Sequence, residues 1–136
     1  MVSLHQLEHL EVTVELWSEP KHQPKLMEIN AVAKNIRISP RKVRLVSGSL
    51  KGMAAKKALE YLRFANKSSA LPLSKVIKSA LSNATNNFKL EEDKLKIKDI
   101  AVEEGPTLKR FRARSRGIAH SILKRTSHIK VVLEDV

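Results

Sequence analysis

Cysteine is absent from this chain of 136 residues, and glycine and aromatic residues are scarce. The lack of cysteine excludes disulfide bonds and thiolate zinc sites, and it fits a reducing compartment. The four glycines form neither of the two common phosphate-binding motifs, G-x-x-x-x-G-K-[ST] and G-x-G-x-x-G. No apolar run approaches the ~20 residues of a membrane-spanning helix, and no secretory signal pattern is present. We therefore expect one domain of an intracellular protein.

Histidines and acids do not form a catalytic or metal-binding pattern. His5 and His9 have helical i, i+4 spacing, but no third ligand lies near them in sequence, so we expect no metal. No acid lies near His120 to orient its ring as a general base, and the same holds for His128. We expect neither enzyme activity nor a cofactor.

Charge divides the chain into three parts. The formal net charge is +12 and the isoelectric point is near 10.2, which favours an anionic partner such as nucleic acid. Residues 1–28 have two lysines against five glutamates, a net charge of −3; residues 29–104 have +9 and residues 105–136 have +6. Pro20 and Pro24 are typical of a linker. We predict that 1–28 is an acidic N-terminal extension.

The extension has two competing patterns. Its apolar residues recur at three- and four-residue steps, which fits a short amphipathic helix; they are Leu4, Leu7, Leu10, Val14 and Trp17. Val12, Val14 and Leu16 also alternate, which fits a strand. The pattern does not choose between docking on the domain, contact with a partner and a segment that stays mobile.

The segment 105–128 is strongly basic. No acid occurs between Glu104 and Glu134, and such a run of one sign needs an anionic partner. Arginines occupy every second position at 110, 112, 114 and 116. In an extended backbone they would point to one face, as a comb that suits a line of phosphates.

Three helices and three strands are predicted around this segment. They are a strand at 29–38, helices at 40–51, 54–64 and 70–86, a strand at 95–102 whose alternation shifts near Asp99, and a return strand at 129–133. Ser39-Pro40 is a helix start and Gly52 a helix stop. The two last strands bracket the basic segment and predict a long antiparallel hairpin, mobile until its charge is matched.

Several stretches resemble one known family. They are 39–46 (SPRKVRLV), 80–84 (ALSNA) with Asn87, 102–106 (VEEGP), 108–110 (LKR) and 123–129 (LKRTSHI) followed by Val131-Val132. In this collinear order, over about 29–136, the chain resembles large-ribosomal-subunit protein family twenty-two, the uL22 type. The resemblance implies an α+β fold: a small antiparallel sheet packed on three helices, with a long protruding β-hairpin at about 95–133.

The same resemblance implies a function. A family member is a structural component of the large subunit that binds ribosomal RNA, supports assembly and lines the peptide exit tunnel with its hairpin. Its partners would be large-subunit ribosomal RNA, neighbouring ribosomal proteins and the nascent chain, with no membrane. Its location would be a cytoplasmic ribosome, or that of an organelle.

Site residues carry over by position. The RNA-binding residues would be Lys34, Ser39, Arg41, Lys42, Arg44, Lys109, Arg110, Arg112, Arg114, Arg116, Lys124, Arg125, Thr126, Ser127 and His128. The tunnel-lining tip would comprise Arg112, Ala113, Arg114, Ser115, Arg116, Gly117, Ile118 and Ala119. At Ala113 the family commonly has Pro, and at Ile118 it commonly has Arg.

Two other interpretations are weaker. A DNA-binding helix-turn-helix would use 40–51 and 54–64, but the second helix has no Asn or Gln to read adenine edges. A polyanion or membrane-surface binder would need interleaved apolar anchors, and 105–128 has Phe111 as its only aromatic residue.

Overall fold

The computed structural model describes residues 27–136, which form an α+β fold. Its elements in order are β1 (Glu28–Ile36), α1 (Pro40–Ser47), α2 (Ala55–Phe64), α3 (Ala70–Phe88), η1 (Glu92–Lys94), β2 (Leu95–Glu104), β3 (Leu108–Ala113), η2 (Ser115–Gly117), β4 (Ala119–Lys124) and β5 (Ser127–Asp135). The expectations for residues 1–26, including the paired histidines, lie outside the described residues.

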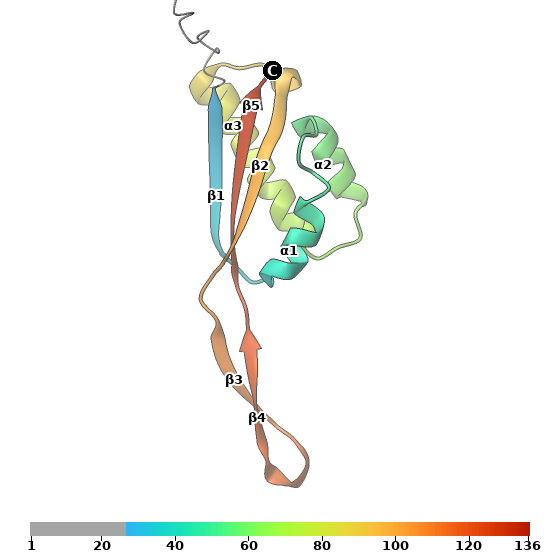
Figure 1. Cartoon of the computed structure of the whole chain (residues 1–136), viewed down its shortest axis with the longest axis vertical. Coiled ribbons are helices and arrows are strands. Elements are labelled where there is room, and N and C mark those ends of the chain that lie inside the picture. Colours follow the sequence, from blue (N-terminus) through green and yellow to red (C-terminus); the bar gives the residue numbers. More distant parts are fainter. Residues whose placement is uncertain (1–26) are drawn as a thin grey trace, which may run out of the picture.

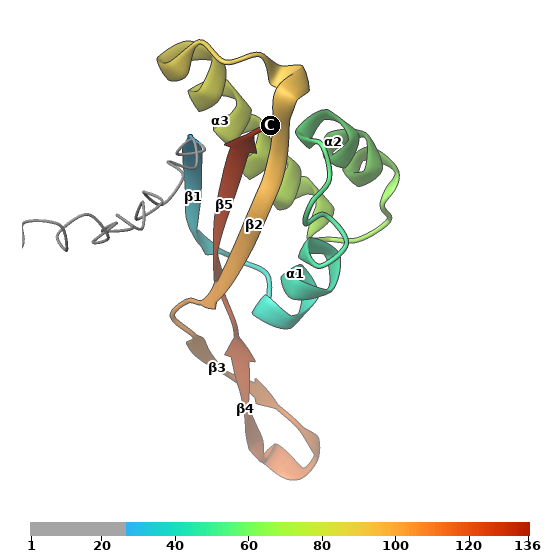
Figure 2. The same ribbon diagram turned by 45° about the horizontal axis from the view of Figure 1, so that its top comes forward.

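The strands form two antiparallel sheets. The main sheet has the order β1-β5-β2, and β3 and β4 form a separate two-stranded sheet. The helices cover one face of the main sheet, with α3 lying across it, and the second sheet projects well beyond the helices (Figure 1). The turned view separates the layer of helices from the sheet and shows the same projection (Figure 2). The predicted fold is confirmed.

The first helix ends earlier than predicted. Ser39 has the extended backbone of an N-cap and Pro40 is the first helical residue, as expected, but α1 ends at Ser47 rather than at 51. The backbone N–H of Gly52 donates to Ile97 O at 2.8 Å, and Ile97 N–H donates to Met53 O at 2.9 Å. This pairing with β2 draws the chain out of the helix before Gly52 is reached.

The second and third helices match their patterns. The predicted apolar residues of α3 are buried, and Pro72 lies in its first turn where no N–H is needed. Ser69 precedes α3, but its hydroxyl does not cap the helix. Instead Ser69 Oγ donates to Lys42 O at 3.1 Å, which ties the start of α3 to α1.

The core is entirely aliphatic. Apart from Pro40, every buried apolar side chain among the described residues is Ala, Val, Leu or Ile, with Leu73, Ile77 and Leu133 fully enclosed. All three phenylalanines are exposed: Phe64 by 88%, Phe88 by 43% and Phe111 by 79%. Aromatic side chains usually dominate cores because of their large buried area. Here they lie on the surface, where they are free to contact partners.

The hairpin has two segments joined by a register shift. Between the pairs Glu104↔Ser127 and Leu108↔Lys124, three residues (105–107) face two (125 and 126). An extra residue of this kind bends and twists the strands. We call 108–124 the arm and residues 105–107 with 125–128 the shoulder. The expected phase change near Asp99 is a second such shift, between Ile97 and Asp99.

The arginine comb is shorter than predicted. Arg110 and Arg112 alternate within β3, and Arg114 keeps an extended backbone. Arg116 has φ 58° and Gly117 has φ 70°, both in the left-handed region. Because the chain reverses here, with Arg114 N–H bonded to Ile118 O at 2.8 Å, Arg116 leaves the strand face. The comb therefore has three members.

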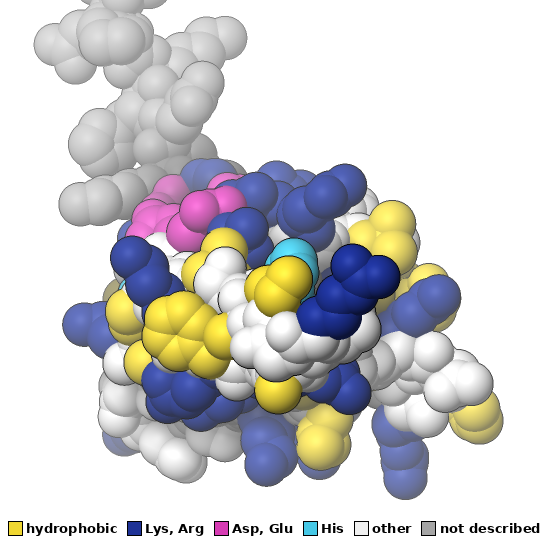
Figure 3. Space-filling model, turned by 90° about the horizontal axis from the view of Figure 1, so that it is seen from below, with side chains coloured by type: hydrophobic (Ala, Val, Ile, Leu, Met, Phe, Trp, Pro, Cys, Tyr) yellow, Lys and Arg dark blue, Asp and Glu magenta, His cyan; other side chains and the backbone are white. Residues whose placement is uncertain are grey.

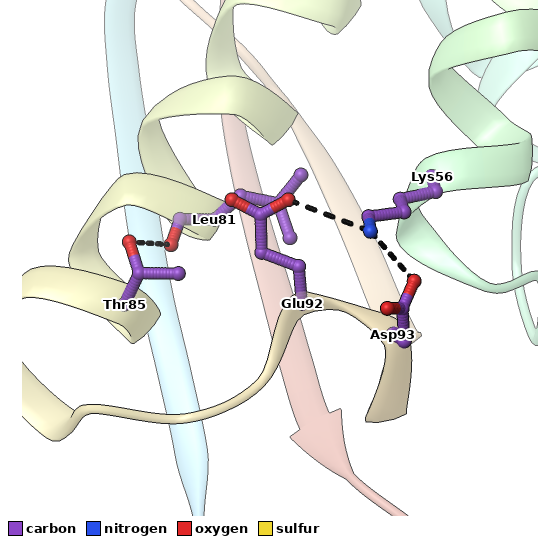
Figure 4. Close-up of polar contacts among 5 residues, drawn as sticks. All are labelled: Lys56, Leu81, Thr85, Glu92 and Asp93. Atoms are coloured by element: carbon purple, nitrogen blue, oxygen red, sulfur yellow. Dashed lines mark hydrogen bonds and ion pairs between the residues drawn. The ribbon is translucent and has the colours of Figure 1, made fainter.

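Ion pairs gather on the body of the domain, away from the arm. Lys56 Nζ lies 2.6 Å from Asp93 and 3.9 Å from Glu92, which joins α2 to η1 (Figure 4). The hydrogen bond and charge of Asp93 raise the pKa of Lys56. Lys98 lies 2.5 Å from Glu28, linking β2 to β1, and the hydrogen bond from Lys98 lowers the pKa of Glu28.

Candidate nucleic-acid interface

The N-terminus of α1 is built to attract anions. Pro40 is the first helical residue, no acid lies in the first turn, and the exposed cations Arg41 and Lys42 follow directly. Cations at this end oppose the helix dipole, so a bound anion would relieve their repulsion and also meet the positive end of the helix. The chain forms this start because Ser-Pro fixes an extended residue followed by the φ of a helix.

A hollow joins the start of α1 to the base of the arm. Its volume is about 480 Å³. Its lining comes from three separate stretches of sequence: Arg37, Ile38, Ser39, Lys42, Ser68, Leu123, Lys124 and Arg125. Four of these are cations, and no acid lines the hollow. Such a group of guanidinium and ammonium groups suits anionic oxygens, phosphate oxygens among them.

A second hollow, of about 380 Å³, lies next to the first. Pro40, Arg41, Glu104 and Arg125 line it together with Ser39. Arg125 and Ser39 belong to both hollows, so the two form one continuous surface around the start of α1. Glu104 is the only acidic residue that lines this combined surface, and it belongs to the second hollow alone.

The arm presents its cations to solvent. From Lys109 to Lys124 every Lys and Arg is exposed, and none of them makes an ion pair within the described part of the chain. Seen from the end of the arm, Lys and Arg side chains are spread over the surface, whereas Asp and Glu form one group at its side (Figure 3). Residues 27–136 therefore leave the arm's charge unmatched.

The shoulder holds three of the predicted RNA-binding residues, two of them in the interior. Thr126 and Ser127 are buried and His128 is half-buried. Thr126 Oγ1 donates to Pro106 O at 2.7 Å, and His128 Nδ1 accepts from the N–H of Asn35 at 3.0 Å. These side chains contact the protein's own backbone and set the direction of the arm. Ser127 Oγ is buried and has no hydrogen-bond partner among residues 27–136.

Arg44 also serves the structure. Its Nε and Nη2 donate to Val102 O at 3.3 and 3.0 Å, so its guanidinium ties α1 to β2. Lys34 is exposed on β1 but lines neither hollow. The predicted set thus splits into exposed cations around α1 and the arm, and residues that position the arm.

Sequence reasoning missed four lining residues of the first hollow: Arg37, Ile38, Ser68 and Leu123. Arg37 lies two residues before Ser39-Pro40, where α1 starts, so its charge and its position together could have indicated that it belongs to the site. Ser68 and Leu123 enter only through folding, because the loop before α3 and the end of β4 meet the start of α1.

Other kinds of site are not evident in residues 27–136. No group of three or more His, Asp or Glu side chains there could hold a metal ion. No helix in the same range is long and apolar enough to cross a membrane.

Comparison with known proteins gives a consistent result. A family model described as Ribosomal protein L22p/L17e matches residues 31–134. Proteins named "Large ribosomal subunit protein uL22" from Staphylococcus aureus strains JH9 and Newman are 50% identical to this chain over 109 residues. The match covers 80% of this chain and 93% of each relative.

Proposed function

Because the chain belongs to the ribosomal protein L22p/L17e family, we propose that its arm and the start of α1 bind large-subunit ribosomal RNA. The family role is structural, as a component of the large ribosomal subunit, and its partners are ribosomal. The single observation that carries the proposal is the acid-free hollow of Arg37, Lys42, Lys124 and Arg125.

Binding would rest on phosphate contacts rather than on base reading. The surface is dominated by Lys and Arg, which position a nucleic acid through its backbone. RNA helices are recognised mostly by shape and by backbone contacts. Arg110 and Arg112 extend the hollow's charge along one strand of the arm, so a single path of phosphates could follow α1 and then the arm.

The tip, residues 112–119, would line the exit tunnel and meet the nascent chain. Two things support this proposal: the hairpin that is typical of the family, and the length and exposure of the arm in this chain. Ala113, where the family commonly has Pro, pairs with Ala119 at the end of the ladder between β3 and β4. This position therefore remains part of the strand. Ile118, where the family commonly has Arg, is 58% exposed. The tip would therefore offer an apolar side chain at this position instead of a positive charge.

The proposed division of the chain follows from the same role. Residues 29–136 would be the RNA-binding domain and residues 1–28 an extension added to it. The ribosome that contains it would be cytoplasmic. The residues proposed for RNA contact are the half-buried Ser39 and the exposed Lys34, Arg41, Lys42, Lys109, Arg110, Arg112, Arg114, Arg116, Lys124 and Arg125, with Arg37 added. Arg44, Thr126, Ser127 and His128 would act by positioning the others.

The test is a salt titration of RNA binding. Lys42→Gln with Lys124→Gln should weaken binding of a large-subunit RNA fragment and lower the slope of log K against log salt by up to about two, one for each phosphate that a lysine no longer neutralises. The matched control is Lys96→Gln with Lys130→Gln, two exposed lysines on the open face of the main sheet. Equal slopes for both pairs would show that the hollow has no special part in binding.

A further inference from the structure

A groove of about 590 Å³ lies between the end of α2 and the first half of α3. Its floor is aliphatic and is formed by Leu59, Leu62, Ala65, Ala70 and Leu71. Leu71 is 65% exposed, although an apolar side chain of this size gains by burial. A hollowed apolar surface of this kind marks an interaction site.

Phe64 is close to the groove in sequence but does not line it. It is the last residue of α2, lies between groove residues Arg63 and Ala65 in sequence, and is the most exposed large apolar side chain of the described residues, at 88%. Tyr61, one turn earlier, is 47% exposed. Neither ring lines the groove, so the apolar surface offered to a partner there is the groove itself.

The rim of the groove is basic. Arg63, Lys67 and Lys78 line it against a single acid, Glu60. None of these three cations makes an ion pair with another described residue. The fitting partner therefore combines carboxylates for the rim with aliphatic or aromatic side chains for the floor. Nucleic acid would supply the charge but no aliphatic side chains, so a protein segment fits better.

We propose that residues 4–17 of the same chain dock in this groove. The segment has apolar side chains at three- and four-residue steps, among them Leu7, Leu10 and Trp17, and glutamates at 8, 11 and 15 between them. An amphipathic segment placed along two helices puts its apolar face on the floor and its charges on the rim. The segment comes from the only net-acidic part of the chain, so its charge complements the rim.

The connection is long enough. Nine residues, 18–26, separate Trp17 from the first described residue, and an extended chain of that length spans about 30 Å. Asn83 Nδ2 donates to Asn30 O at 3.3 Å, which holds the start of β1 against α3. Lys78 lies five residues before Asn83, about 8 Å along the helix axis. Trp17 can therefore reach the Lys78 end of the groove, with the rest of the segment running toward Leu71.

Docking within one chain has a kinetic and energetic advantage. A covalent connection replaces a bimolecular encounter by a high effective concentration, so a modest contact area suffices. The groove and the hollow at the start of α1 share no lining residue, but a third hollow, lined by Lys42, Lys67 and Ser68 among others, lies between them. The docking is tested without RNA, so its outcome does not depend on RNA binding by the arm.

The chain contains its own reporter, because Trp17 is its only tryptophan. In the full chain without RNA, Trp17 fluorescence should lie at shorter wavelength and resist acrylamide quenching, as expected for a ring packed on the groove. Lys67→Glu with Lys78→Glu should return both readouts to those of the chain in denaturant. Adding Glu11→Lys and Glu15→Lys to that variant should restore the packed signal.

The control has the same charge change on another face. Lys96→Glu with Lys130→Glu, on the open face of the main sheet, should leave the Trp17 signal unchanged, and circular dichroism should confirm that all variants are folded. A solvent-exposed Trp17 in the full chain would overturn the proposal. So would an equal response to both lysine pairs, or a packed signal that appears only as protein concentration rises, which would place the segment on a second copy.

Discussion

The hydroxyl of Thr126 and the carbonyl of Pro106 are joined by a 2.7 Å hydrogen bond across the shoulder. The bond closes the point where the strands change register between the main sheet and the arm. Gly105 N–H also donates to Thr126 O at 3.0 Å. A Cβ at Gly105 would overlap Thr126 Oγ1 and lie 3.1 Å from His128 Cε1. The shoulder is therefore a tightly packed joint that fixes where the arm points.

Replacing Gly105 by Ala should disturb this joint. The overlap with Thr126 forces a shift of backbone or side chain, and overpacking of this kind costs about 1–3 kcal/mol of unfolding free energy. Thr126→Ala should cost about 1 kcal/mol, because it removes the hydrogen bond to Pro106. Since Thr126 Oγ1 is the overlapping atom, the double variant should be less destabilised than the sum of the two. Urea unfolding of all four proteins measures this coupling, and strict additivity would contradict it.

Truncating a core side chain should lower the free energy of unfolding strongly, whereas truncating an exposed aromatic side chain should hardly change it. Leu133 is fully buried, so Leu133→Ala should lower the free energy of unfolding by about 2–5 kcal/mol. Phe111→Ala removes a larger side chain, but one that is 79% exposed, and should change stability by no more than about 0.5 kcal/mol. Thermal or urea unfolding of both variants measures these changes. A large decrease for Phe111→Ala would mean that the arm packs against the domain.

The arm should open more easily than the main sheet. Its strands are almost wholly exposed, whereas β5 alternates buried Ile129, Val131 and Leu133 between two neighbouring strands. Few buried contacts mean a low free energy of local opening. Without RNA, amide hydrogens of β3 and β4 should exchange much faster than those of β5, and RNA should slow them. Equal protection of both sheets without RNA would contradict this expectation.

An ion pair on β2 should give the protein an acid-dependent part of its stability. Asp99 lies 2.5 Å from Lys51 Nζ, and the hydrogen bond from Lys51 holds the pKa of Asp99 below its ordinary value of 3.8. Because the native pKa is the lower one, the contribution is complete above pH 3.8 and disappears as pH falls through the native pKa.

Asp99→Asn should therefore reduce stability at neutral pH but not at strongly acidic pH. Urea unfolding of both proteins across the acid range measures the difference between them. Glu60→Gln is the matched control, since Glu60 makes no ion pair with the described residues. A difference between Asp99→Asn and its parent that stays constant down to low pH would show that the ion pair is not its source.

Local patterns predicted the elements well where side chains pack directly on the core. The alternation of Ile129, Val131 and Leu133 predicted β5, and the phase change near Asp99 located a real register shift. The predicted end of α1 was wrong because Gly52 pairs through its backbone with Ile97, a residue distant in sequence, and this pairing draws Gly52 away from the helix. Arg116 left the comb because the chain must reverse within a few residues.

The candidate site was predicted residue by residue but not as a surface. Ser39, Lys42, Lys124 and Arg125 were each expected to contact RNA, and the structure brings them around one hollow. No local pattern reveals that positions more than 80 residues apart meet, because that meeting depends on strand pairing and helix packing. The interior position of Thr126 and Ser127 was hidden for the same reason: a polar pair beside two cations looks like a surface motif.

A density map of the assembled large subunit containing this chain tests the central claim most directly. The account predicts that the arm lies between RNA segments, with phosphates in the hollow lined by Arg37, Lys42, Lys124 and Arg125. An arm that extends into solvent, with that hollow free of RNA, would contradict it.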